Sequence, residues 1–319
     1  MPGARAFVGV TDGDWYRLLS SQTELEEANF WQPGGNRAFS ALSPGEIFLF
    51  KLHAHDGGAI VGGGFFTHCS LLPVSLAWQA FGIGNGATSL IEMRNRIEKY
   101  RREIAKPHED YTIGCILLSQ PFFLSRESWI EEPSDWHPNI VQGKTYSSDS
   151  VHGRQLIERV EHVLSLQAAR EKNANGSAGS RAIEEKGRYG SPILVKPRLG
   201  QGSFRIVVTD AYSRRCALSG ERVLPVLEAA HIRPFGQGGA HEVRNGLLLR
   251  SDLHTLFDRG YLTITPERDV EVSKRIHDEY ENGKEYYALH GRKILLPRRS
   301  AEVPAEDNLR WHNENVFAG

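Results

Sequence analysis

The stretch from Val226 to Gly260, VLEAAHIRPFGQGGAHEVRNGLLLRSDLHTLFDRG, constrains the fold of this chain most tightly. Its first apolar run, Val226–Ile232, predicts a strand, and a loop containing glycine and proline follows it. The apolar run that starts at Gly246 predicts a second strand. Ser251 can cap a short amphipathic helix, and Gly260 suits the position just past the end of that helix. The stretch therefore predicts the order strand, loop, strand, helix.

Polar residues lie at the ends of these expected elements. His231 ends the first strand, Asn245 precedes the second, and His254 is in the first turn of the helix. Asp258 follows His254 by four residues, so the two side chains share a helix face. The segments AAHI, NGLLL and DLHTLFDRG, in this order, resemble the HNH, or ββα-metal, nucleases. This resemblance implies an α+β nuclease domain that hydrolyses phosphodiester bonds.

The chemistry of hydrolysis explains why these residue types occur together. A neutral imidazole on a strand is a suitable base near neutral pH, and we expect His231 to activate the attacking water. A divalent cation held by His254 would stabilise charge on the phosphate. Asp258 would supply a hard oxygen ligand, which suits Mg²⁺ or Mn²⁺, or it is a surface carboxylate paired with Arg259 or solvent. The resemblance implies that Asn245 ties the loop to the strand or orients the base.

One position departs from the family pattern. Many HNH nucleases carry a metal-binding Asp or His directly before the catalytic His, and here that residue is Ala230. Glu228 points to the same strand face as Ala230 by alternation, and it either reaches the metal or lies in solvent. The departure favours one alternative, a nucleic-acid-binding protein whose HNH fold is catalytically idle.

Composition limits the other possibilities. A length of 319 residues predicts two domains, and a net charge of −1 argues against strong non-specific DNA binding by the whole molecule. Cys69, Cys115 and Cys216 are too few and too scattered for a disulfide framework, and the chain has no CxxC pair, so we expect no structural zinc. The N-terminus does not resemble a signal peptide, and no apolar stretch is long enough to span a membrane. We therefore expect a cytoplasmic protein with no membrane partner.

The first half of the chain contains a second family resemblance. A turn and apolar run, PGEIFLF at 44–50, precede IVGGGFF at 60–66, whose glycines predict a bulge or the close approach of a backbone or ligand. This pattern resembles the PUA-like domains, the β-barrels that include EVE and SRA-type readers of modified bases. We expect a PUA-like β-barrel with helices at 1–170, a polar linker at 171–187, and the HNH domain at 188–319.

A reader of modified bases needs aromatic and amide groups around a flipped base. Asn29 and Gln32 offer amides for the edge of the base, and Phe30 or Trp31 offers a ring to stack on it. The alternative is that the two aromatic residues belong to the core beneath a loop.

Basic and amide side chains elsewhere are candidates for contact with the DNA backbone. Arg198, Gln201 and Arg205 precede the nuclease core, with structural salt bridges or hydrogen bonds as the alternative. Lys144 lies in a segment that reads as a loop at the end of the first domain, and an ordinary turn is its alternative. A capping box at Ser89 predicts a helix to about residue 104, whose arginines (Arg94, Arg96, Arg101 and Arg102) face either phosphates or solvent.

Together these features predict a modification-dependent restriction endonuclease. Its N-terminal domain would recognise 5-methylcytosine or 5-hydroxymethylcytosine in double-stranded DNA by flipping the base, and its HNH domain would cut nearby. One HNH site cuts one strand, so a double-strand break implies a homodimer or two binding events. The remaining alternative is an HNH nuclease whose N-terminal domain reads RNA or a DNA sequence.

Overall fold

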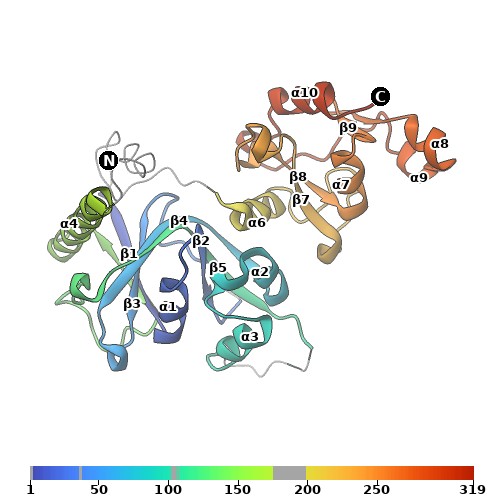
Figure 1. The fold of residues 1–319 in the computed structure, drawn as a ribbon. Coiled ribbons are helices and arrows are strands. Elements are labelled where there is room, and N and C mark those ends of the chain that lie inside the picture. Colours follow the sequence, from blue (N-terminus) through green and yellow to red (C-terminus); the bar gives the residue numbers. More distant parts are fainter. Residues whose placement is uncertain (1–2, 36–37, 102–105, 107, 175–198) are drawn as a thin grey trace. The chain divides into compact units, whose positions relative to one another are not determined.

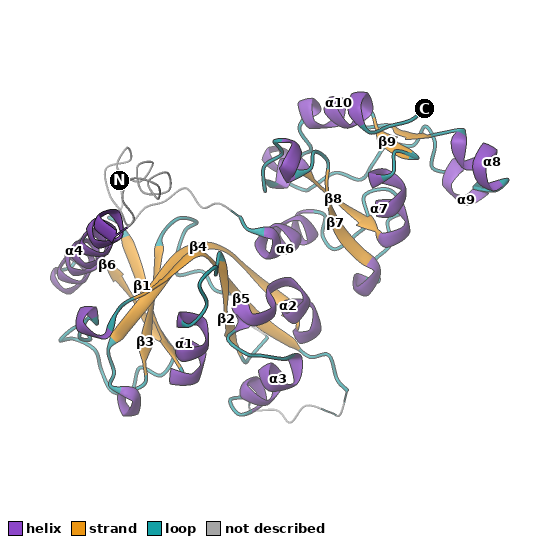
Figure 2. Ribbon diagram, viewed as in Figure 1, coloured by secondary structure: helices purple, strands orange, loops and turns teal. Residues whose placement is uncertain are grey.

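The computed structural model describes residues 3–35, 38–101, 106, 108–174 and 199–319. The chain divides into two compact units, Met1–Arg198 and Leu199–Gly319. Each unit combines helices and strands, as Figure 2 shows, which confirms the expected α+β class. The long helix α4 (Val151–Ala174) includes the first four residues of the expected linker. The rest of that linker lies outside the described residues.

The first unit is built on one mixed sheet of six strands in the order β2-β5-β4-β3-β1-β6 (Figure 1). β1 and β3 run parallel, and the other neighbouring pairs are antiparallel. The strands are β1 (Arg5–Thr11), β2 (Glu27–Gln32), β3 (Ile47–Leu52), β4 (Ile60–Pro73), β5 (Thr112–Phe123) and β6 (Gly143–Ser147).

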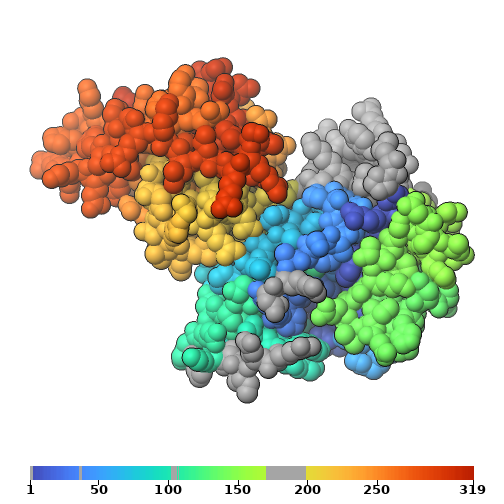
Figure 3. Space-filling view, turned by 180° about the vertical axis from the view of Figure 1, so that it is seen from behind, coloured from blue at the N-terminus to red at the C-terminus, as the bar shows by residue number. Residues whose placement is uncertain are grey.

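The central strand β3 is buried along its whole length because both faces of the sheet are covered. Ile47 and Leu49 belong to a core cluster that includes residues of α4. Phe48 and Phe50 belong to a second cluster on the other side, together with Trp15 from α1 (Gly13–Ser20). This alternation follows from the two-residue period of a strand. Figure 3 shows the side of this unit on which the residues of α4, in green, form part of the surface.

The strands of the described residues do not close into the barrel that we expected. β2 and β6 lie at opposite edges of the sheet and do not pair with each other. The expected pairing of the 44–50 and 60–66 segments is present, since β3 pairs with β4. A Cβ atom on Gly62 would lie 2.3 Å from the carbonyl oxygen of Phe122, and one on Gly63 would lie 2.6 Å from that of Phe48. These glycines therefore permit close approach of neighbouring backbones.

Two further helices, α2 (Val74–Phe81) and α3 (Leu90–Glu98), complete the first unit. The hydroxyl of Ser89 accepts a hydrogen bond from the Glu92 amide and so caps α3, as expected. The Glu92 carboxylate bonds the amide of Thr88, one residue earlier than a capping box requires. α3 ends at Glu98, before the predicted end near residue 104.

The second unit begins with α6 (Gln201–Ala211), followed by the antiparallel pair β7 (Leu227–His231) and β8 (Gly246–Arg250). α7 (Ser251–Asp258) follows β8 directly and buries Leu253 and Phe257. The predicted order of strand, loop, strand and helix is confirmed.

The ends of α7 test the two predicted caps separately. Ser251 is the first helical residue and not the cap, because Arg250 occupies the N-cap position without a side-chain capping bond. Gly260 follows the helix with a φ of 72°, the left-handed conformation expected at this position.

The remaining residues pack around this core. β9 (Leu262–Ile264) and β10 (Val270–Val272) form a hairpin. The short helices α8 (Arg275–Tyr280) and α9 (Lys284–Tyr287) precede the last helix, α10 (Glu306–Asn315). Between α9 and α10 an isolated bridge joins Lys293 to Asp269.

Candidate active site

His231 occupies the last position of β7, where the strand meets the loop that leads to β8. Its ring lies flat on the ring of Phe204 from α6, with centroids 3.8 Å apart and planes 8° apart. Nε2 of His231 lies 2.9 Å from Nδ1 of His241, which belongs to the intervening loop. The imidazole is therefore fixed by one stacked ring and one hydrogen bond.

His254 projects from the first turn of α7 between two carboxylates. Its Nδ1 lies 2.7 Å from Oε2 of Glu228 on β7, and its Nε2 lies 3.3 Å from Oδ2 of Asp258 on its own helix. The (i, i+4) spacing of His254 and Asp258 explains the second contact. Antiparallel pairing of β7 with β8, which α7 follows, brings Glu228 close to α7. Glu228 therefore contacts the helix, while its side chain also remains 47% exposed to solvent.

Asn245 is almost fully buried, at 2% exposure, and its side chain holds the loop between the strands. Its Oδ1 accepts from the amide of Arg233 at 2.9 Å. Its Nδ2 donates to the carbonyl oxygens of Arg233 at 2.8 Å and Ala240 at 3.0 Å. The described side-chain contacts of Asn245 therefore join both ends of the loop, and none of them reaches the His231 ring.

Electrostatic effects link these side chains into one site. Burial, with smaller contributions from His241 and His254, lowers the pKa of His231 to about 4. Burial raises the pKa of Asp258, and the nearby Glu228 carboxylate adds to this effect. Burial also lowers the pKa of Arg205, which Glu228 opposes. His254 thus lies close enough to His231 to lower its pKa, and Arg205 of α6 lies near the Glu228 carboxylate.

The donor chemistry of Glu228, His254 and Asp258 fits a divalent cation. Two carboxylates and one imidazole suit Mg²⁺ or Mn²⁺, which prefer oxygen ligands. Both ring nitrogens of His254 face carboxylates in this structure. No group of three or more His, Cys, Asp or Glu side chains is already arranged to hold a metal ion among the residues that the structure describes.

A comparison with protein families identifies this region. The family model HNH_2, described as HNH endonuclease, matches residues 216–265. Residues 216–265 form an HNH endonuclease domain. The matched range contains β7, β8, α7 and the site residues between Glu228 and Asp258. HNH endonucleases are phosphodiester hydrolases that usually use a divalent metal, so the match supports a nuclease.

Other comparisons add little to this assignment. No curated protein matches the chain. Among solved structures, a "Modification dependent TagI restriction endonuclease" aligns over 97% of this chain and 81% of its own, at 14% identity and a TM-score of 0.29. A TM-score of this size does not establish a shared fold. No helix in the described part of the chain is long and apolar enough to cross a membrane.

The HNH domain also clarifies the role of its cysteine. Cys216 is fully buried, and its Sγ accepts backbone N–H bonds from Ser219 at 3.4 Å and Arg250 at 3.3 Å. It therefore fixes the turn before the hairpin, as a small buried residue. None of the chain's three cysteines, all of which lie in the described ranges, forms a disulfide.

The N-terminal residues predicted to hold a modified base lie on strand β2. Phe30 is a core residue, 9% exposed and packed against Trp15, Phe48 and Phe50, so its ring is not available to stack on a base. The alternative of a core aromatic residue holds for Phe30, because α1 covers this part of strand β2. The expectation for Phe30 is therefore wrong.

The other three predicted base-binding residues differ in exposure. Asn29 is fully buried and donates from Nδ2 to Asn85 at 2.9 Å, which removes it from the surface. The indole N–H of Trp31 donates to the carbonyl oxygen of Asn85 at 2.9 Å, and Trp31 and Gln32 are half-buried. A pocket of about 230 Å³ lies between residues 130–134 and α4, and none of the four predicted residues lines it.

Most basic residues proposed for DNA contacts have partners within the protein. Lys144 belongs to strand β6 and not to a loop, and it pairs with Asp135 at 2.6 Å. In the α3 region, Arg94 pairs with Glu98, Arg96 pairs with Glu92, and Arg101 donates to the carbonyl oxygen of Pro33. These contacts stabilise the fold. Gln201 is exposed at the start of α6. Arg198 and Arg102 lie outside the described residues.

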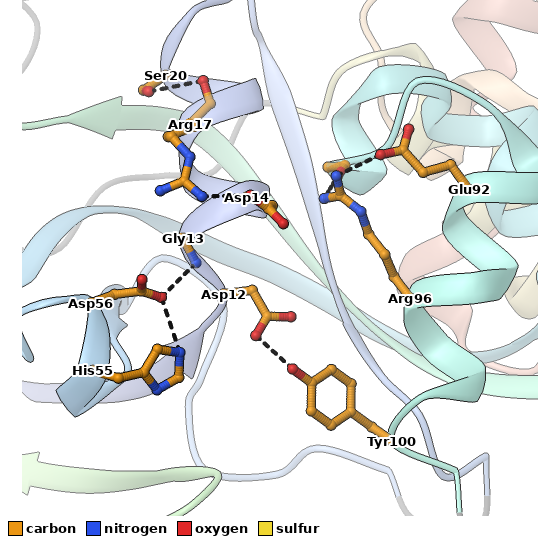
Figure 4. A network of polar contacts seen from close by, with 11 residues as sticks. Asp12, Gly13, Asp14, Arg17, Ser20, His55, Asp56, Glu92, Arg96 and Tyr100 are labelled. Atoms are coloured by element: carbon orange, nitrogen blue, oxygen red, sulfur yellow. Dashed lines mark hydrogen bonds and ion pairs between the residues drawn. The ribbon is translucent and has the colours of Figure 1, made fainter.

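A polar network on the first unit fixes the start of α1 (Figure 4). Asp12 accepts a hydrogen bond from the hydroxyl of Tyr100 at 2.7 Å, and Asp56 accepts one from the amide of Gly13 at 3.3 Å. His55 lies 3.5 Å from Asp56. These contacts tie three separate segments together and indicate a structural role.

Two residues of the site were not foreseen from the sequence. His241 lies in the glycine-containing loop, and a histidine there carries no periodic signal. Phe204 belongs to the GQGSFR segment, which only predicted contacts with DNA. Gln201 and Arg205 lie four residues apart and so share one face of α6, whereas Phe204 packs on His231. α6 therefore presents one face to solvent and another to β7.

Proposed function

We propose that the HNH domain hydrolyses one strand of DNA with His231 as the general base. The observation that supports this most directly is the imidazole of His231, held by a stacked ring and a hydrogen bond in the same ββα unit as the Glu228–His254–Asp258 cluster. A lowered pKa keeps the ring neutral at physiological pH, so it is able to accept a proton. His231 takes a proton from water, the resulting hydroxide attacks phosphorus, and the bond to the leaving 3′ oxygen breaks.

Glu228, His254 and Asp258 are the proposed metal-binding residues. A bound Mg²⁺ or Mn²⁺ supplies a positive charge that stabilises the phosphate and the leaving oxygen. Glu228 takes the place of the ligand that Ala230 cannot provide, because Glu228 already contacts His254. Asn245 keeps the loop after His231 in place. Arg198, Gln201 and Arg205 are candidates for contacts with DNA phosphates. Lys144 is a further candidate, and it would have to break its ion pair with Asp135 to bind a phosphate.

We propose that the first unit recognises modified cytosine in double-stranded DNA, which makes the protein a modification-dependent restriction endonuclease. Support comes from the PUA-like pattern in the sequence, from the β3–β4 pair with its glycines, and from a unit separate from the nuclease. Trp31 and Gln32 remain the candidates for base contact among the four residues named above. A homodimer would allow both strands to be cut.

Cleavage of defined substrates tests both parts of the proposal. Supercoiled plasmids with 5-methylcytosine, 5-hydroxymethylcytosine or no modification, and a single-stranded RNA, are incubated with the full chain and Mg²⁺ or Mn²⁺. Preferential nicking of modified DNA supports the whole proposal. Equal cutting of all DNAs removes the modified-base reader and leaves the nuclease. Binding without cutting favours the second candidate function, an idle HNH fold, which the alanine at position 230 supports.

A further inference from the structure

His241 contacts the proposed base directly and has no role in the function described so far. Its Nδ1 lies 2.9 Å from Nε2 of His231, and the ring is half-buried in the loop between β7 and β8. The ring of Phe235 stacks on His241, with centroids 4.7 Å apart and planes 14° apart. Phe235 is 65% exposed, so the outer side of the histidine pair reaches the surface.

The shared hydrogen bond restricts the tautomers of the two rings. A neutral imidazole has one N–H donor and one acceptor nitrogen. If His241 donates, then His231 uses its lone pair on Nε2 and carries a proton on Nδ1, and it cannot accept another proton from water. If Nε2 of His231 donates, Nδ1 keeps a free lone pair, and this nitrogen has no hydrogen-bond partner among the described residues. Only the second arrangement makes His231 a base.

We propose that His241 is the proton acceptor behind His231, an inference that rests on the proposed role of His231 as base. An O–H bond of water breaks as an N–H bond forms at Nδ1 of His231. The N–H bond at Nε2 of His231 breaks as an N–H bond forms at Nδ1 of His241. The hydroxide attacks phosphorus, and the P–O3′ bond breaks with its electron pair on O3′, which takes a proton from solvent.

The surroundings of the two rings explain why such a transfer is useful. Phe204 covers one face of His231, and His254 lies near it, so positive charge on His231 is disfavoured. A transfer to His241 moves that charge toward the exposed edge of the domain, which water can solvate. His231 stays neutral, with the proton from water on Nδ1. That proton then leaves for solvent as His241 returns a proton to Nε2 of His231, which restores the starting tautomer.

Substitution of His241 by asparagine separates proton transfer from positioning. The asparagine oxygen lies near the place of Nδ1 and accepts the same hydrogen bond, but it does not take up a proton. His290→Asn is the matched control, because Nδ1 of His290 accepts a hydrogen bond from the amide of Val272 in another part of the unit. Nicking of the preferred plasmid is measured for the wild type, His241→Asn, His241→Ala, His290→Asn and His231→Ala, with thermal unfolding to verify folding.

We expect His241→Asn to lower kcat on the order of 100-fold, with KM within about twofold of the wild type, because proton transfer and not binding is lost. Added imidazole should accelerate His241→Ala and leave the wild type unchanged. A wild-type rate in His241→Asn overturns the relay and leaves the proposed function intact if His231→Ala is inactive. A wild-type rate in His231→Ala removes the proposed base and, with it, the relay.

Discussion

The rings of Phe204 and His231 lie face to face, 3.8 Å apart between centroids and 8° from parallel. Phe204 is 1% exposed and belongs to the core of the HNH domain. The contact joins α6, which precedes the family-matched range, to the last residue of β7. The environment of the proposed base is therefore set by a helix outside the ββα unit itself.

Replacement of Phe204 by leucine should change the pKa of His231. The smaller side chain exposes the imidazole to water, so the pKa should rise from about 4 toward its ordinary 6.5. Loss of buried aromatic surface should also lower the free energy of unfolding by about 1–3 kcal/mol. NMR titration of the ring protons and denaturant unfolding measure the two effects.

Phe257→Leu is the control, because Phe257 stacks on His312 with centroids 3.7 Å apart and planes 11° from parallel. It should raise the pKa of His312 in the same way. An unchanged His231 pKa in Phe204→Leu contradicts the assignment of burial as the cause.

The stability of the protein should depend on pH through His231 and His312. The pKa of each is lowered to about 4 from 6.5, mainly by burial, so the folded state favours neutral rings. Their contribution to stability is complete above pH 6.5, declines as the pH falls from 6.5 to 4, and is lost below 4. Denaturant unfolding across this range should give a falling free energy of unfolding, with a shallower slope in His312→Gln. Identical slopes in the two proteins would mean that His312 does not titrate as described.

Asn245→Ala should loosen the loop between β7 and β8. The substitution leaves the amide of Arg233 and two carbonyl groups without their side-chain partner, which should cost about 1–3 kcal/mol of unfolding free energy. Hydrogen exchange of residues 232–245 should accelerate, and nicking should slow. Asn313→Ala is the control, since Nδ2 of Asn313 also bonds two carbonyls, Ile264 and Leu309, elsewhere in the unit. Slow exchange of the loop in Asn245→Ala would show that other contacts hold it.

Glu228→Gln should weaken metal binding. The substitution removes one of the two carboxylates beside His254, and Mn²⁺ affinity should fall by at least about tenfold. Calorimetric titration with Mn²⁺ measures the change, and Glu271→Gln on β10 serves as the control carboxylate. Equal affinities in Glu228→Gln and the wild type would leave His254 and Asp258 without the proposed third ligand.

The nuclease half of the fold was predictable because its local signals agree. The apolar runs, the glycine after α7 and the helical spacing of His254 and Asp258 all favour one ββα arrangement. The contact of Glu228 with His254 depends on the pairing of β7 with β8, and alternation within one strand could not supply it. His241 was missed because loop residues follow no period.

The first half was less predictable because burial there depends on tertiary packing. Phe30 and Asn29 looked like pocket residues, yet α1 and the 82–85 segment cover β2. Lys144 and the arginines of the α3 region looked available for phosphate. Arg94 and Arg96 pair with carboxylates four residues away on the same helix. Arg101 bonds the carbonyl oxygen of Pro33, and Lys144 pairs with Asp135 in a preceding loop, contacts that depend on tertiary structure. The apolar runs were sufficient to predict the strands. They do not show whether the two edge strands pair to close the sheet into a barrel.

Nicking of supercoiled DNA by matched histidine variants tests the central claim most directly. Single-turnover rates with Mg²⁺ or Mn²⁺ are compared for the wild type, His231→Ala and His312→Gln, the last of which alters a buried, stacked histidine outside the site. A base at His231 predicts a rate loss of about 10²–10⁴-fold in His231→Ala and near wild-type cutting in His312→Gln. Equal rates in His231→Ala and the wild type, or a wild type that binds DNA and never cuts it, would contradict the account.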